Sequence, residues 1–230
     1  MQLGATAMYV TRPNDHLERQ PISESGAASR MRHLHRLQPG KHLFHEGQDA
    51  RNIYEVVSGV LRLTRVLEDG RRQVIAFGYP GDVVGFPSDG RYHTDCDVLR
   101  AAAVVVHNRS ALESNKGDAA LRTRLLQAAL REISAMQDHF LMLGRKSASE
   151  RVASFLCILS ERVGTDLGQF TQFDLPMSRS DIADFLGLTT ETVCRTFTQL
   201  RKSNVIALDR VHTVIVLKPR DLLAVAEGDI

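Results

Sequence analysis

Two charged side chains, Glu191 and Arg195, have types and a spacing suited to reading nucleic acid bases, and Cys194 lies between them. An arginine offers two parallel donors that match O6 and N7 of guanine, while a carboxylate can accept a hydrogen bond from N4 of cytosine. Residues four apart lie on one face of a helix, so both side chains could reach neighbouring base pairs. The alternative is a surface ion pair between them, which would stabilise a helix by only a few tenths of a kcal/mol.

The sequence around these residues predicts a helix-turn-helix at 179–198, RSDIADFLGLTTETVCRTFT. Ala183 is small enough for two helices to approach, Gly187 can turn the chain, and Val193 can anchor the second helix. Other apolar residues fall at helical spacing on the buried face: Ile182, Phe185, Leu186, Leu188, Phe197 and Leu200. The polar side chains of the second helix therefore point outward, where they are candidate base readers.

A hairpin is predicted directly after the second helix. In VIALDRVHTVIVLK, residues 205–218, apolar residues recur with a period of two on either side of Asp209 and Arg210, as in two paired strands. Helix, turn, helix and hairpin in this order make a winged helix, so we predict DNA binding. Base contacts are predicted for Glu191, Cys194 and Arg195. Phosphate contacts are predicted for Arg179, Ser180, Thr189, Thr190, Lys202 and Lys218.

The overall composition is that of a globular chain with a slight excess of positive charge. With 230 residues and 43% hydrophobic content, the chain is long enough for one large or two small domains. The net charge of +2 means that a nucleic acid surface must come from local charge, which gathers in the C-terminal third. No apolar run is long enough to span a bilayer, and MQLGATAMYV lacks the features of a secretory signal. We therefore expect a cytoplasmic protein with no membrane partner.

The N-terminal part predicts an all-β domain. From residue 34 to 112, short apolar runs are punctuated by glycines, which is typical of a sandwich or barrel. Gly59 is expected to separate two strands within residues 54–66. The predicted fold class is α+β, with a flexible arm at 1–30, a jelly-roll β-barrel at 31–117, a long dimerisation helix at 118–147 and a winged helix-turn-helix at 148–230.

The stretch 118–147 predicts one long helix, because it contains no proline and its first glycine is Gly144. Apolar positions at steps of four and three form the seam of a parallel coiled coil, which predicts a homodimer on a two-fold symmetric DNA site. The seam residues are Leu126, Leu130, Ile133, Gln137 and Phe140. A second stripe through Leu125, Met136 and Leu143 could face the barrel. The alternative is that the whole apolar surface is core within one domain.

Histidines cluster near the start of the predicted barrel without forming a complete metal site. His33 and His35 share a face at strand spacing, and His42 and His45 lie close by in the sequence, so a metal or haem site is conceivable. No nearby carboxylate or thiolate pattern completes it. The three cysteines are likewise too few and too far apart for a disulfide framework or a four-thiolate site. We therefore predict no metal and no cofactor.

Four segments stand out in chain order: KHLFHEGQDARNIYEVVSGVLRL at 41–63, PGDVVGF at 80–86, LGRKSASERVASFL at 143–156 and MSRSDIADFLGLTTETVCRTF at 177–197. On these segments the chain resembles the CRP/FNR superfamily of bacterial transcription regulators from residue 34 onward. The last two segments are most similar to the FNR branch, and within it to FixK/FnrN-type regulators of low-oxygen gene expression. The resemblance implies a transcription activator whose partners are double-stranded DNA, a second copy of the chain and RNA polymerase.

The resemblance also indicates which effectors the barrel lacks residues for. Cyclic-nucleotide members carry a glutamate for the ribose and an Arg-Ser pair for the phosphate, where this chain has Phe86-Pro87-Ser88 and Arg100-Ala101. Iron–sulfur members need four cysteines, but residues 1–95 contain none, and Cys96 alone cannot bind a cluster. We expect neither group. The alternative function is a regulator of the same superfamily gated by a cyclic nucleotide or haem.

In the FNR branch a Glu-x-x-Ser-Arg motif reads TTGA-type half-sites, which implies a target related to TTGA-N-TCAA. Glu191 and Arg195 match this motif, and Cys194 replaces its serine. The cysteine is either a serine-like filler or a regulatory thiol whose oxidation would place a negative group against DNA phosphate. An enzyme is not expected, because no catalytic spacing occurs between residues 30 and 150.

Overall fold

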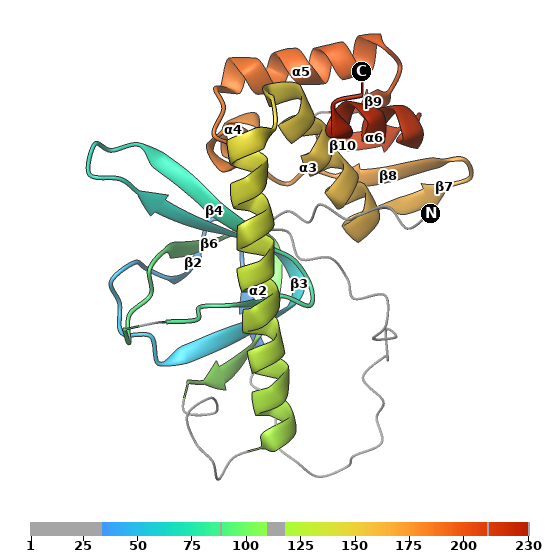
Figure 1. Cartoon of the computed structure of the whole chain (residues 1–230). Helices are drawn as coiled ribbons and strands as arrows, with labels where there is room; N and C mark the ends of the chain where they lie inside the picture. Colours follow the sequence, from blue (N-terminus) through green and yellow to red (C-terminus); the bar gives the residue numbers. More distant parts are fainter. Residues whose placement is uncertain (1–33, 88, 110–117, 211, 230) are drawn as a thin grey trace.

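The computed structural model describes residues 34–87, 89–109, 118–210 and 212–229. The arm predicted at 1–30 lies outside these residues, as do His33 and Ser88. A β-barrel is followed by one long helix and by a mixed domain of helices and a small sheet (Figure 1). The predicted α+β class is therefore confirmed.

The barrel is built from antiparallel strands around a long central pair. Its strands are β1 (Leu34–Leu37), β2 (His42–Phe44), β3 (Asn52–Val66), β4 (Arg72–Gly78), β5 (Val83–Val84) and β6 (Asp95–Asn108). The order is β1-β6-β3-β4, with β2 paired to β6 and β5 paired to β3. Because β3 and β6 pair along nearly their full length, they hold the barrel together and carry most of its buried apolar residues.

Gly59 does not end a strand, so the predicted break in 54–66 is wrong. Strand β3 continues through Gly59, and its register with β6 shifts on both sides of it. Gly59 has a φ of +84°, and a Cβ atom there would lie 2.3 Å from the carbonyl oxygen of Ala101. Only glycine fits this irregularity, which bends the strand around the barrel and keeps its pairing.

Helix α2 (Ala119–Arg145) runs along the barrel and up to the C-terminal domain (Figure 1). The Asp118 side chain begins it by accepting hydrogen bonds from the backbone N–H groups of Ala120 and Leu121. The inner stripe of the helix consists of Leu125, Ala128, Ala135 and Met142. Met136, which could have faced the barrel, is 50% exposed because it lies one residue beyond this stripe.

The C-terminal domain consists of four helices and a four-stranded sheet. Its elements are α3 (Ala148–Val163), β7 (Thr165–Leu167), β8 (Phe170–Asp174), α4 (Arg179–Leu186), α5 (Thr190–Lys202), β9 (Ile206–Asp209), β10 (Thr213–Val216) and α6 (Pro219–Glu227). The predicted hairpin is β9–β10, and the sheet order is β7-β8-β10-β9. Strands β7 and β8 were not predicted, because short polar strands show little periodicity until they pair with a distant partner. Among the helices of the described residues, none has both the length and the hydropathy to cross a bilayer.

Candidate DNA-binding site

Helices α4 and α5 form the predicted helix-turn-helix. Helix α4 begins at Ser178, whose side chain and that of Asp181 form a reciprocal capping box. The helix ends at Gly187, which has a φ of +62°, a conformation that favours glycine. Thr189 then begins α5 by accepting a hydrogen bond from the backbone N–H of Thr192 at 3.1 Å. The turn between the two helices is therefore determined by residues within it.

The inner faces of α4 and α5 are buried against each other and against α3. Their apolar side chains are at most 4% exposed: Ile182, Ala183, Phe185, Leu186, Val193, Phe197 and Leu200. Burial of each large aliphatic or aromatic side chain stabilises the domain by roughly 1.5–3 kcal/mol. This packing fixes the rotation of α5 about its axis, and therefore decides which of its side chains reach solvent.

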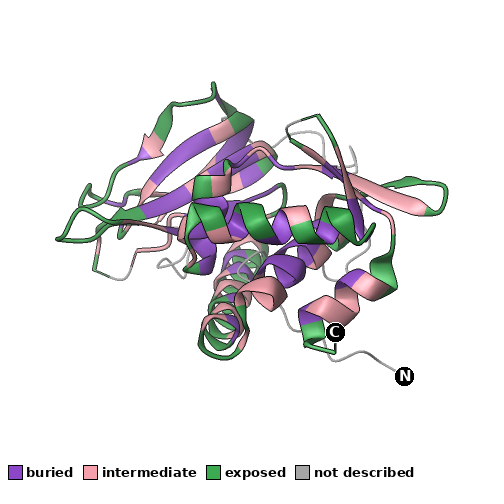
Figure 2. Cartoon of the chain, turned by 90° about the horizontal axis from the view of Figure 1, so that it is seen from above, coloured by how far each residue is buried: buried purple, intermediate pink, exposed green. Residues whose placement is uncertain are grey.

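The outward face of α5 carries the side chains that were predicted to read bases. Glu191, Cys194, Arg195 and Gln199 are all exposed. Viewed from above, α5 lies across the molecule with exposed residues recurring along it (Figure 2). In the described part of the chain, no ion pair joins Glu191 to Arg195. The structure therefore does not contain the surface salt bridge that was the alternative interpretation of these two residues. Both charged groups are open to an external ligand.

The residues predicted to contact phosphates lie around this face on several elements. Ser180 is in the first turn of α4, Thr189 and Thr190 begin α5, and Lys202 is in its last turn. All four are exposed or partly exposed, and the first three lie at helix N-termini, where free N–H groups favour anions. Lys218 precedes α6, and its Nζ atom lies 3.5 Å from a carboxylate oxygen of Asp221.

Arg179 has a packing contact that the sequence did not reveal. Its guanidinium carbon lies 3.8 Å from the centre of the Phe197 ring, a cation–π contact between the start of α4 and the middle of α5. Burial lowers the pKa of Arg179. The phosphate contact predicted for Arg179 stays a prediction. To make it, the guanidinium would have to contact a phosphate while it remains stacked on the Phe197 ring.

Arg151 of α3 fixes the helix-turn-helix relative to the long helix. Its guanidinium donates to the carbonyl oxygens of Leu143 at 2.7 Å, Lys146 at 2.9 Å and Leu186 at 3.1 Å. The first two carbonyls lie at the end of α2 and the third at the end of α4, where helices leave carbonyl groups without partners. A cation at two helix C-termini is also favoured by the helix dipoles.

Asp181 joins the helix-turn-helix to the barrel. One carboxylate oxygen accepts hydrogen bonds from the backbone and hydroxyl of Ser178, which completes the cap of α4. The other accepts from Arg62 of β3 at 2.5 Å and from Arg72 of β4 at 2.7 Å. The Asp181 side chain is only 5% exposed, so these arginines supply the positive charge that a buried carboxylate requires.

Further polar contacts extend this connection on both sides. Arg62 also makes a two-pronged ion pair with Asp97 of β6, at 3.1 and 2.9 Å. Arg72 also pairs with Asp184 of α4 at 2.7 Å. Elsewhere, Arg162 of α3 pairs with Asp82 beside β5 at 2.6 Å, and this pair too is largely buried. We use the term "interdomain latch" for the group Arg62, Arg72, Asp97, Asp181 and Asp184.

Two titratable groups at the domain junction have shifted pKa values. Burial by itself raises the pKa of Asp181, but the hydrogen bonds from Ser178 and the charge of Arg62 outweigh it, so the pKa is lowered. The stability that Asp181 contributes is thus present above its ordinary pKa and is lost as the pH falls through the lowered value.

His139 of α2 stacks on Phe185 of α4, with ring centroids 4.4 Å apart. Burial lowers the pKa of His139 from 6.5 to about 4, so the ring is neutral at neutral pH.

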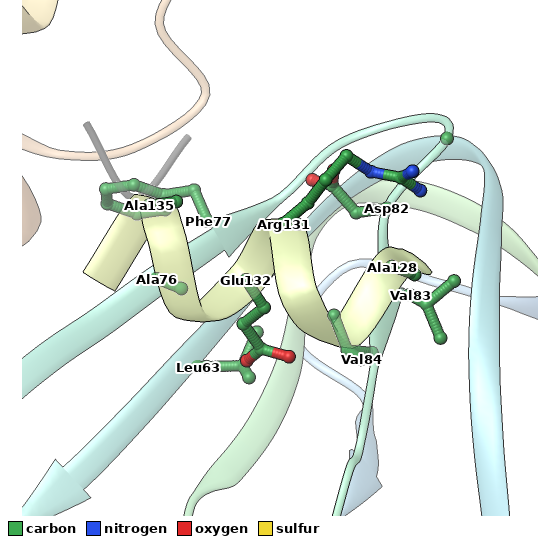
Figure 3. Close-up of a pocket in the computed structure, with 12 residues that line it drawn as sticks. Leu63, Ala76, Phe77, Asp82, Val83, Val84, Ala128, Arg131, Glu132 and Ala135 are labelled. Carbon is green, nitrogen blue, oxygen red and sulfur yellow. The ribbon is translucent and has the colours of Figure 1, made fainter. Parts of the chain in front are cut away.

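A small cavity lies between α2 and the barrel (Figure 3). Ala128 and Ala135 of α2 face apolar residues of β3 to β5, while Arg131 and Glu132 extend from the helix in different directions. The cavity volume is about 40 Å³, whereas sites for drug-sized ligands are roughly 300–1,000 Å³. Its lining also includes Asp82, whose carboxylate is paired with Arg162. The small volume is unfavourable for a cyclic phosphate in this cavity.

A barrel joined by a long helix to a winged helix-turn-helix defines a class of DNA-binding transcription regulators that carry a sensor-type domain. Two family models match the chain: the cyclic nucleotide-binding domain over residues 34–114 and the Crp-like helix-turn-helix domain over residues 150–225. The chain belongs to the CRP/FNR family of transcription regulators.

Characterised relatives lie in the FixK and FNR part of this family. The nitrogen fixation regulation protein FixK of Azorhizobium caulinodans is 43% identical over 76% of this chain and 71% of its own length. The transcriptional activator protein FnrL of Cereibacter sphaeroides is 34% identical over 90% of this chain and 85% of its own. The structure of FixK2 from Bradyrhizobium japonicum superposes with a TM-score of 0.75, at 33% identity, over 84% of this chain and 96% of that one. These relatives are transcription regulators and not enzymes, and this chain is a FixK/FNR-type regulator.

The buried carboxylate of the latch can be tested by Asp181→Asn. Asparagine can still accept from Ser178, but it cannot balance two arginines, so we expect the free energy of unfolding to fall by about 3 kcal/mol. Denaturant unfolding of the full chain measures this. Asp166→Asn, at an exposed position of β7, is the matched control and should leave stability unchanged. Equal stability of Asp181→Asn and the parent would contradict the role assigned to the latch.

Proposed function

We propose that this regulator binds, as a homodimer, a palindromic DNA site related to TTGA-N-TCAA and activates transcription there through contact with RNA polymerase. The observation that carries the proposal is the outward face of α5, where Glu191 and Arg195 are exposed and not paired with each other. The names of relatives such as the fumarate and nitrate reduction regulatory protein of Salmonella typhimurium favour a role in low-oxygen metabolism. The cytoplasm is the proposed location because the target is DNA.

Arg195 and Glu191 have complementary roles in this proposal. Arg195 donates to O6 and N7 of a guanine. Glu191, which lies one helical turn before Arg195 on α5, accepts from N4 of a cytosine in a neighbouring base pair. Thr189, Thr190 and Ser180 hold backbone phosphates with their hydroxyl and N–H groups, which sets the register of α5 in the groove. Lys202 and Lys218 add charge without sequence preference.

Replacing Arg195 with alanine tests the base readout. We expect Arg195→Ala to weaken binding to the TTGA palindrome by about 1–3 kcal/mol and to relax the preference at its guanine, because the two-pronged contact is lost. Lys202→Ala is the matched control and should weaken all DNA sequences alike. Fluorescence anisotropy with the palindrome and with base-substituted sites at fixed salt measures both. An unchanged guanine preference in Arg195→Ala would contradict the assignment.

The dimer in this proposal forms through the outward side of α2. Leu126, Leu130 and Ile133 are each more than half exposed, and Phe140 is 76% exposed. These side chains, with the exposed Gln137, follow the a/d spacing of a two-helix coiled coil. A stripe of large apolar residues on one helix is unfavourable in water, and a second copy of α2 would cover it. Parallel pairing would bring two α5 helices to successive major grooves.

The double variant Leu130→Glu, Phe140→Glu tests this interface. Two carboxylates on each seam would repel across the pair, so we expect monomers and a loss of affinity for the palindrome of at least about tenfold. Sedimentation velocity measures the oligomeric state. Val66→Glu is the control, since Val66 is also exposed, at 54%, but lies on the barrel strand β3. A double variant that remains dimeric would rule out this seam.

We propose that the regulator works without an iron–sulfur cluster or a cyclic nucleotide. The small size of the cavity between α2 and the barrel supports this, and so does the absence of cysteine before Cys96. The alternative is gating by a cyclic nucleotide or haem in the barrel. A rise in melting temperature with cyclic nucleotide, or a haem absorption band, would favour the alternative.

Cys194 is exposed on the same face as Glu191 and Arg195, where oxidation would interfere with DNA binding. A sulfinic or sulfonic acid there would add negative charge facing DNA phosphates. We expect Cys194→Ser to bind the palindrome in the reduced state as the parent does, and to keep binding after peroxide treatment that inactivates the parent. Gel-shift titration before and after peroxide measures this. Equal inactivation of parent and variant would exclude Cys194 as the sensitive group.

A further inference from the structure

A group of three potential metal ligands lies at one edge of the barrel, on residues that do not line the small cavity. His42 of β2, His45 directly after β2 and Asp95 at the start of β6 each offer one ligand atom, and these three atoms lie within 4.8 Å of one another. Both histidines are exposed and Asp95 is partly exposed. The sequence had two close histidines but no pattern that completed a site, and the fold supplies the carboxylate of Asp95 from 50 residues away.

A β-bulge brings the two imidazoles to the same side. Residues three apart on a regular strand point to opposite faces, so His42 and His45 would diverge. Here His42 pairs with Asp97 and Phe44 pairs with Cys96, so that two steps along β2 match one step along β6. The extra residue reverses the alternation, and the two rings stack with centroids 4.3 Å apart.

Asp95 is held in place beside His45. One of its carboxylate oxygens accepts the backbone N–H of Glu46 at 2.9 Å and lies 3.2 Å from Nδ1 of His45. Ligand atoms around a tetrahedral zinc ion are roughly 3.3 Å apart, because each lies about 2.0–2.1 Å from the metal. The His45–Asp95 pair already has this separation, and rotation of the exposed His42 ring can shorten the remaining distances. A hydrogen bond to a ligating carboxylate also orients it, as in known metal sites.

Asp95 is the acidic member of the group. Two neighbouring acidic side chains are already paired with arginines: Glu46 contacts Arg65 at 3.1 Å, and Asp97 contacts Arg62 at 2.9 Å. Asp95 gives the group a carboxylate, and one divalent ion can bind both rings and this carboxylate at once.

We propose that His42, His45 and Asp95 form a binding site for a divalent transition-metal ion of the Zn²⁺ class. Two imidazole nitrogens and one carboxylate oxygen suit Zn²⁺, Co²⁺ and Ni²⁺ better than Mg²⁺ or Ca²⁺, which prefer oxygen ligands. The exposed site leaves at least one coordination position for water or for a group from another molecule. Its ligand Asp95 lies two residues along β6 from Asp97, which is a member of the interdomain latch.

Calorimetric titration of the reduced full chain with Zn²⁺ tests the site. We expect the parent to bind one equivalent there, and His42→Ala, His45→Ala and Asp95→Asn each to raise the dissociation constant of this equivalent by roughly tenfold or more. The amide introduced by Asp95→Asn would keep an oxygen that accepts from Glu46, so this variant removes the charge without removing the local hydrogen bond. The exposed positions of both histidines make loss of folding unexpected, and thermal unfolding without metal checks it.

His93→Ala is the matched control, because His93 also lies beside a carboxylate, 3.3 Å from Asp89, but belongs to no such three-ligand group in the described residues. It should bind Zn²⁺ as the parent does. Titration with Co²⁺ separates this site from the exposed thiol of Cys194, since nitrogen and oxygen ligands give no thiolate charge-transfer band. The proposal is overturned if the parent binds no Zn²⁺, if the three variants bind it as the parent does, if His93→Ala loses as much, or if the Co²⁺ spectrum is that of a thiolate.

Discussion

The carboxylate of Asp181 is the group on which the arrangement of the two domains depends. It is buried, it completes the cap of α4, and it accepts from two arginines of the barrel that precede it by more than 100 residues in the chain. A buried charge without partners is strongly unfavourable, so the first helix of the helix-turn-helix is most stable where Arg62 and Arg72 reach it. Arg151 acts similarly at the other end of α4, where it connects the ends of α2 and α4. The position of α5 relative to the barrel is thus determined by charge pairing in addition to apolar contact.

The exposed surfaces of α2 and α5 differ in character. The outward side of α2 is apolar, with Phe140 at 76% exposure. The outward side of α5 is polar, with a carboxylate and a guanidinium that do not pair with each other. An apolar stripe suits another protein surface, while open donors and acceptors suit bases and phosphates. Helix α4 is connected to α2 through Arg151 and to the barrel through Asp181. A partner bound along α2 and DNA bound at α5 would therefore contact elements that are joined to each other by these contacts.

The barrel combines a small cavity with two irregular strands. The glycine bulge at Gly59 bends β3, and the bulge in β2 brings His42 and His45 together beside Asp95. Bulges redirect side chains without breaking the sheet, so a strand can keep its structural role and gain a polar group on one edge. The edge with the histidines and the latch share strand β6, which carries both Asp95 and Asp97. The proposed metal ligand Asp95 and the latch residue Asp97 therefore lie two positions apart on one strand.

The helix-turn-helix, the outward face of α5 and the long helix could all be predicted from the sequence. Each depends on local rules: the spacing of Ala183, Gly187 and Val193, the 3.6-residue period, and a stretch free of proline. The continuation of β3 through Gly59, the exposure of Met136 and the strands β7 and β8 could not, because they depend on pairing and packing with distant residues. The same holds for Arg62 with Asp181 and for His45 with Asp95, which are separated by 119 and 50 positions. Periodicity belongs to a single segment of backbone, whereas an ion pair or a ligand group between remote segments exists only after strand register and domain packing have brought those segments together.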